Sequence, residues 1–174
     1  AGNEYDKEGN ETYRDGQYTY NYTQIVSSYG AYTSKNKSDL KAKVNALKPA
    51  GCTAADYAMN RTKILVEQSK TDANNNADRK NAKRVVIFTD GAPNHQSGFD
   101  ESVANSAITS AKTIKADADI YTIGIFSGAD VSITGHSGSG SWSAKEKFNA
   151  FMHGLSSNYP DAETYKKLGT VRRI

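Results

Sequence analysis

The chain has 174 residues, 37% of them hydrophobic, and its 22 basic and 19 acidic residues give a formal net charge of +3. This length suits one domain with a buried core. Because the basic residues are scattered and the mean hydropathy is −0.70, the composition points to neither nucleic acid nor a membrane surface as a partner. No run of residues approaches the roughly 20 apolar positions of a spanning helix, so we expect no membrane insertion.

The single cysteine and the three histidines exclude two kinds of site. Cys52 has no second cysteine with which to form an internal disulfide. His95, His136 and His153 lie far apart and lack the spacing of a metal-ligand cluster, so we expect them to be solvated or to pack. The remaining composition, rich in Tyr, Asn, Ser, Thr and Gly, suits an extracellular surface.

The first third of the chain predicts one strand and two helices. Residues 17–26 alternate aromatic and polar side chains, which is the period of a half-buried strand. Ser38 is predicted to cap a helix that ends at residues 48–51. A second helix is predicted over residues 54–69. The first helix has an apolar stripe of Leu40, Val44 and Leu47.

The rest of the chain alternates strands and helices. Residues 84–89, RVVIFT, form an uninterrupted run rich in β-branched residues, which predicts a strand covered on both faces. An amphipathic helix follows over 102–116, and a second buried strand over 120–126. Further helices are expected from about Ala144 and, more briefly, after Asp161. This alternation predicts an α/β fold with a parallel sheet.

Two oxygen-bearing side chains fall where such folds bind ligands. Ligands collect beyond the carboxyl ends of parallel strands, and Asp90 follows the clearest strand directly. Its carboxylate could reach a cation or a reacting centre, or it could only cap a turn. Thr53 precedes the second helix, where its hydroxyl could bind a ligand or could cap that helix.

Several segments carry a resemblance to a known family. Residues 85–94, VVIFTDGAPN, resemble the von Willebrand factor A strand that carries the last aspartate of the metal-ion-dependent adhesion site. Residues 51–57, GCTAADY, stand where that family has its metal-site threonine. Residues 121–126, YTIGIF, and 151–165, FMHGLSSNYPDAETY, are similar to the branch of Gram-positive pilus-tip and surface adhesins. The likeness spans nearly the whole chain.

The resemblance implies a fold and a site. The fold would be a Rossmann-like three-layer sandwich, with helices on both faces of a mostly parallel sheet. Thr53 would bind Mg²⁺, or another divalent cation, through its hydroxyl, and Asp90 would contribute a carboxylate. Asn94, His95 and Gln96 would border that face and contact the partner, or they could be ordinary loop residues.

The chain departs from the family pattern in its metal motif. The Asp-x-Ser-x-Ser segment that follows the family's central first strand is not among residues 1–174. We therefore expect one incomplete domain, with its missing N-terminal part upstream, and weak or undetectable Mg²⁺ binding by this chain alone. Residues 130–134, DVSIT, imitate the motif, but they follow the strand at 120–126 too closely and have no buried strand of their own.

The resemblance implies a binding module that is not an enzyme. It would be extracellular, attached to a cell wall or pilus, and would bind a host or neighbouring-cell protein or glycan. Two alternatives are a structural pilus or cell-wall subunit and a Mg²⁺-dependent phosphohydrolase. The phosphohydrolase would need a second aspartate where Ala92 stands. Cys52 departs from the small residue usual in the family, and is read as a packed thiol or as a reactive one.

Overall fold

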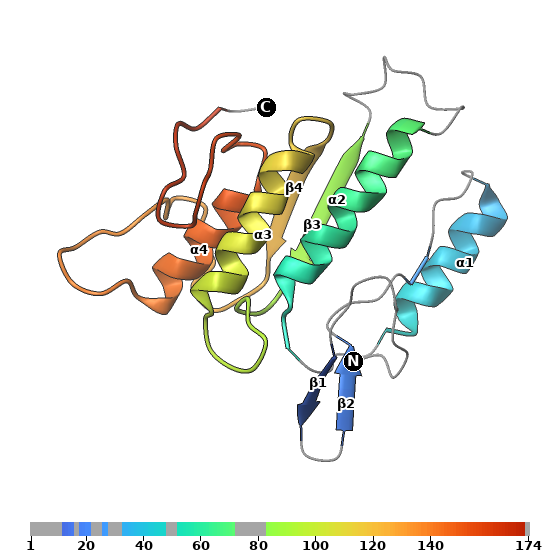
Figure 1. Ribbon diagram of the computed structural model, residues 1–174, viewed down its shortest axis with the longest axis horizontal. Helices are drawn as coiled ribbons and strands as arrows, with labels where there is room; N and C mark the ends of the chain where they lie inside the picture. The colour runs from blue at the N-terminus through green and yellow to red at the C-terminus, as the bar shows by residue number, and fades with distance from the viewer. Residues whose placement is uncertain are drawn as a thin grey trace. The chain divides into compact units, whose positions relative to one another are not determined.

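The computed structural model describes residues 12–15, 18–21, 26–27, 33–47, 52–71 and 83–172. The described residues form a mixed α/β structure with four helices and two small sheets (Figure 1). The chain divides into two compact units, Ala1–Cys52 and Thr53–Ile174. Every helix of the described residues is too short or too polar to cross a lipid bilayer.

The first unit contains a hairpin. Strands β1 (Thr12–Asp15) and β2 (Tyr18–Asn21) pair antiparallel, with Tyr13 opposite Tyr20. The strand predicted over 17–26 is therefore present at 18–21, and residues 22–25 lie outside the described residues.

Helix α1 (Ser34–Asn45) begins earlier than predicted. Its N-cap is Thr33, whose hydroxyl accepts a 3.1 Å hydrogen bond from the N–H of Asn36. Ser38 lies inside the helix, so the predicted cap at Ser38 is wrong, because Thr33 already satisfies a first-turn N–H. No residue of α1 is buried, and the stripe of Leu40, Val44 and Leu47 is exposed.

The second unit contains the parallel strands. In chain order it has α2 (Ala55–Thr71), β3 (Arg84–Thr89), α3 (Glu101–Ile114), β4 (Asp119–Gly124) and α4 (Ala144–Leu155). Val85 pairs with Ile120 and Thr89 with Gly124, in parallel. The predictions of these three helices, of the two strands and of their parallel pairing are therefore confirmed, with bounds that shift by two residues at most.

The core of the second unit lies around α3 and α4. The predicted α3 stripe is buried: Val103, Ala107, Ala111 and Ile114. Between the two helices, Ile108 is fully buried, and its Cδ1 would lie 2.6 Å from a Cβ atom placed on Gly154. The absence of a side chain at Gly154 thus allows the helices to approach closely.

The sheet is covered on one face only among the described residues. Val85 and Ile87 of β3 pack against the core, whereas Val86 and Phe88, on the other face, are 61% and 65% exposed. On the open face of β4, Tyr121 is also exposed. The prediction of two strands covered on both faces is therefore wrong for this part of the chain. β3 alternates between exposed and half-buried residues, and β4 does so after the buried Ile120.

The segment after Asp161 forms a turn instead of the predicted short helix. Thr164 and Lys167 form an isolated antiparallel bridge, and the N–H of Glu163 donates a 3.0 Å hydrogen bond to the carbonyl of Lys167. These bonds fold the segment back on itself, which is incompatible with helical i to i−4 bonding.

Candidate functional site

The hydroxyl of Thr53 lies against the loop that leaves β3. A Cβ atom placed on Gly91 would be 2.8 Å from Oγ1 of Thr53. The N–H of Asn94 donates a 2.9 Å hydrogen bond to the carbonyl of Thr53. The structure therefore brings the segment before α2 and the loop after β3 together at the carboxyl end of β3.

Asp90 lies at the same place. It follows Thr89, the last residue of β3, and is exposed. Neither its carboxylate nor the hydroxyl of Thr53 forms a hydrogen bond or an ion pair within the described part of the chain.

The structure also bears on the capping alternative for Thr53. Helix α2 begins at Ala55, so Ala54 occupies the cap position, and the first helical bond runs from the N–H of Ala58 to the carbonyl of Ala54. Thr53 lies one residue further out. Its hydroxyl is therefore not engaged in capping the helix.

The side chain of Asn94 stabilises the loop after β3 through hydrogen bonds to its backbone. Its side-chain Nδ2 donates hydrogen bonds of 2.8 Å to the carbonyl of Ala92 and 2.9 Å to that of Gly98. Asn94 therefore shapes the loop, whereas Gln96 is exposed near its tip.

His95 fastens the loop to α2. Its Nε2 donates a 2.9 Å hydrogen bond to Oδ1 of Asp56, in the first turn of α2. Its ring stacks on Tyr57 at a centroid distance of 5.1 Å and an interplanar angle of 25°. Sequence reasoning missed Asp56, because a separation of 39 residues gives no local pattern that pairs it with His95.

The oxygen atoms of Thr53 and Asp90 at this end of β3 are of the type that hard cations prefer as ligands. Mg²⁺ prefers oxygen ligands, keeps several of its waters and takes few protein ligands directly. A hydroxyl and a carboxylate meet that preference. Within the described residues there is no group of three or more His, Cys, Asp or Glu side chains that could hold a metal ion.

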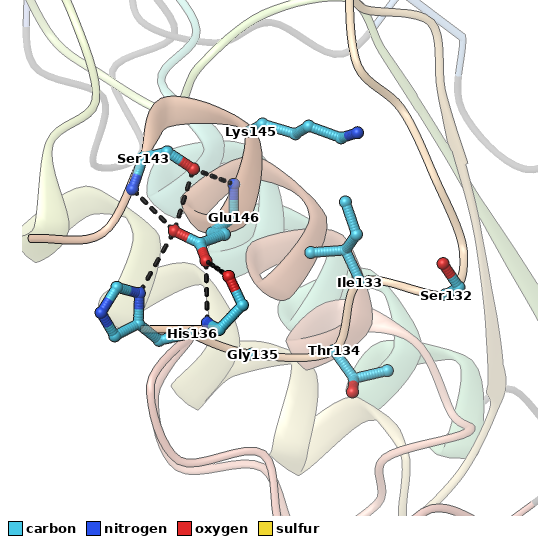
Figure 2. A pocket seen from close by; sticks show the side chains of 9 residues that line it. Ser132, Ile133, Thr134, Gly135, His136, Ser143, Lys145 and Glu146 are labelled. Atoms are coloured by element: carbon cyan, nitrogen blue, oxygen red, sulfur yellow. Dashed lines mark hydrogen bonds and ion pairs between the residues drawn. The ribbon is translucent and has the colours of Figure 1, made fainter. Parts of the chain in front are cut away.

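A second polar region lies in the loop after β4. Residues 132–137 and the first turn of α4 enclose a hollow of about 490 Å³ (Figure 2). Its lining residues are Ser132, Ile133, Thr134, Gly135, His136, Ser137, Ser143, Lys145 and Glu146.

The carboxylate of Glu146 is saturated by hydrogen bonds. It accepts bonds of 2.9 and 2.8 Å from the N–H and hydroxyl of Ser137, and of 2.8 and 2.9 Å from those of Ser143. Nδ1 of His136 adds a bond of 3.2 Å, as Figure 2 shows. The backbone N–H of Ser137, followed by that of Ser143, holds the pKa of Glu146 far below its usual range.

This carboxylate organises the loop. Ser143 is the N-cap of α4 and forms a capping box with Glu146, a pattern that the Ser-x-x-Glu spacing could have predicted. The bonds from Ser137 and His136 have no such local signal. Because the carboxyl group of Glu146 stays ionised, it has no proton to donate as an acid catalyst. Because its oxygens already accept hydrogen bonds from the protein, it does not offer an open cation site.

The DVSIT segment forms a closed turn. The carboxylate of Asp130 accepts hydrogen bonds of 2.9 Å from the N–H and 2.7 Å from the hydroxyl of Ser132. The Ser132 hydroxyl is the main cause that lowers the pKa of Asp130. Because the serine hydroxyl is directed at its own aspartate, this geometry favours a local turn over a metal motif.

Comparisons of the chain with protein-family models, with curated proteins and with solved structures found no match.

Proposed function

We propose that this chain belongs to a metal-assisted ligand-binding domain of the von Willebrand factor A type, which acts in adhesion outside the cell. The observation that carries the proposal is the position of the Thr53 hydroxyl against Gly91, the residue that follows Asp90, whose carboxylate has no bonded partner among the described residues. Residues 37 positions apart in sequence thus provide two oxygen donors at the carboxyl end of one strand.

In this proposal Thr53 and Asp90 hold Mg²⁺ or a similar divalent cation. The hydroxyl binds directly, and the carboxylate binds directly or through a water molecule. The remaining coordination positions hold water, one of which a carboxylate of the partner can replace. Binding by this chain is expected to be weak, with a Kd on the order of millimolar, as in other oxygen-ligand sites with few protein donors.

The proposed fold is the three-layer Rossmann-like sandwich. The exposed Val86 and Phe88 support this, because parallel sheets normally carry helices on both faces. A third layer on that face would complete the sandwich. The proposed partner is a host or neighbouring-cell protein or glycan, and the proposed location is a cell wall or pilus.

The test is binding to a panel of immobilised extracellular-matrix proteins and acidic glycans, measured in Mg²⁺ and in EDTA. We expect binding that needs Mg²⁺ and that is lost in Asp90→Asn. Asp130→Asn is the matched control, because Asp130 is also an acidic residue in a loop that follows a strand, and it should bind normally.

Two results would overturn the proposal. One is panel binding that is equal in Mg²⁺ and in EDTA. The other is a Mg²⁺-dependent phosphatase activity that Asp90→Asn abolishes, since that would make Asp90 a catalytic nucleophile.

A further inference from the structure

The loops that leave β3 and β4 are each held against the start of a helix by the same two kinds of contact. Each contributes a histidine that bonds a carboxylate in the first turn of a helix and stacks on an aromatic ring. In the loop after β3, His95 bonds Asp56 and stacks on Tyr57. In the loop after β4, His136 bonds Glu146 and stacks on Trp142 at 5.3 Å and 16°.

The His95–Asp56 contact acts on the loop that carries Asp90. Asp56 lies three residues after Thr53, and His95 five residues after Asp90. Between them the N–H of Asn94 bonds the carbonyl of Thr53 at 2.9 Å. The contact therefore links the segment that carries Thr53 to the loop that carries Asp90, close to both proposed cation ligands.

The pair is shielded enough to matter energetically. The side chain of His95 is 27% exposed and that of Asp56 is 16% exposed. An ion pair or charged hydrogen bond at such a site contributes more than one in open solvent. Its loss would also leave a partly buried carboxylate without this partner, which disfavours the closed loop.

We propose that His95 and Asp56 are positioning residues that hold the loop after β3 closed on Thr53 before any cation binds. This inference rests on the proposed function of Thr53 and Asp90. If the loop is already closed, cation binding does not have to order it, and no affinity is lost. If the loop is open most of the time, the apparent Kd equals the intrinsic Kd divided by the fraction of molecules in which the loop is closed.

The experiment compares four variants with the wild-type chain. His95→Ala removes the bond and the ring stack, and Asp56→Ala removes the acceptor. Asp56→Asn keeps an oxygen acceptor and serves as the conservative variant. His136→Ala is the matched control, because it breaks the equivalent fastening in the loop after β4.

Two readouts are measured by NMR. The first is hydrogen exchange of the Asn94 amide in cation-free protein, which reports loop closure directly. The second is the Mn²⁺ concentration that half-broadens the Gly91 amide signal, which reports cation affinity. Thermal unfolding of each variant checks that the fold is retained.

We expect His95→Ala and Asp56→Ala to speed Asn94 exchange roughly ten- to hundredfold and to raise the Mn²⁺ concentration needed. Asp56→Asn should restore most of the slow Asn94 exchange and most of the Mn²⁺ affinity. His136→Ala should leave the Asn94 exchange and the Mn²⁺ affinity unchanged. Unchanged Asn94 exchange in His95→Ala, or unchanged Mn²⁺ affinity despite faster exchange, would overturn the inference alone. Failure of Mn²⁺ to broaden Gly91 in the wild-type chain would overturn the proposed function, and the inference with it.

Discussion

Gly91 is the residue at which the candidate site leaves least room. A methyl group there would come within 2.8 Å of Oγ1 of Thr53, closer than non-bonded atoms tolerate. The loop therefore packs closely against the threonine, and a side chain at residue 91 would force the Thr53 hydroxyl or the loop to move.

We expect Gly91→Ala to lower the free energy of unfolding by about 1–3 kcal/mol, the usual cost of overpacking. The double variant Thr53→Ala/Gly91→Ala removes the colliding oxygen and should recover most of the stability. Urea unfolding measures both. Gly135→Ala is the control, since a Cβ there meets nothing within 4 Å. Equal losses in the single and double variants would show that the two residues are not in contact.

His153 gives the chain a pH-dependent stability. Burial lowers the pKa of His153 below its ordinary value of 6.5. Hydrogen bonds to the backbone of Ile133 and Val131 raise this pKa, but their effect is smaller. Its ring also lies edge-on to Tyr159, at 5.1 Å. Between the folded and unfolded pKa values the unfolded chain binds more protons, so stability falls as pH falls below about 6.5.

Urea unfolding between pH 5 and pH 7.5 should therefore show a decreasing free energy of unfolding on acidification. His153→Phe, which cannot bind a proton, should show a shallower slope. A slope as steep in His153→Phe as in the wild-type chain would assign the effect to another group.

The sequence allowed the positions of Thr53 and Asp90 in the fold to be predicted, but not the hydrogen bonds around them. Asp90 ends an unmistakable strand and Thr53 precedes a helix, so both fall at a loop-bearing end of the fold. Their proximity follows from topology. The bonds from His95 to Asp56 and from His136 to Glu146 depend on the path of each loop, which periodicity does not specify.

At the scale of helices, the contact between α3 and α4 depends on Gly154. Ile108 is fully buried and its Cδ1 lies 2.6 Å from where a Cβ of residue 154 would be. The gain in helix propensity from alanine, up to about 1 kcal/mol, is smaller than the expected steric cost.

Gly154→Ala should therefore destabilise the chain by about 1 kcal/mol in chemical unfolding, despite the better helix former. Adding Ile108→Val removes the colliding methyl and should partly restore stability, a non-additive effect expected of residues in contact. A stabilised Gly154→Ala variant would contradict this account of the helix contact.

Helices and strands of the second unit were predictable because their apolar periodicity is strong. The α3 stripe is buried as expected, and the strands at β3 and β4 pair in parallel. The start of α1 was not predicted, because Thr33 and Ser38 are both good capping residues and the chain offers no pattern that ranks them. The turn after Asp161 depends on backbone bonds that have no sequence signature.

At the scale of the whole molecule, the described residues leave one apolar sheet face open. Its most exposed members are Phe88 and Val86, at 65% and 61%. The sequence run RVVIFT could not reveal this, because β-branched residues fit a covered strand and a half-covered one equally well. Large exposed apolar patches promote association.

We expect the isolated chain to bind the dye ANS and to self-associate as its concentration rises, both measured against Phe88→Ser. The variant should reduce dye binding and association with little loss of stability, because residue 88 faces outward. Dye binding and sedimentation that Phe88→Ser leaves unchanged would contradict an open face at β3.

The most direct test of the central claim, that Thr53 and Asp90 together hold a divalent cation, is site-resolved broadening of NMR signals by substoichiometric Mn²⁺. We expect the amides of Gly91 and Ala54 to broaden first, and Asp90→Asn or Thr53→Ala to weaken this broadening. Broadening centred on Ser132 and Asp130, or spread evenly over the acidic surface, would contradict it.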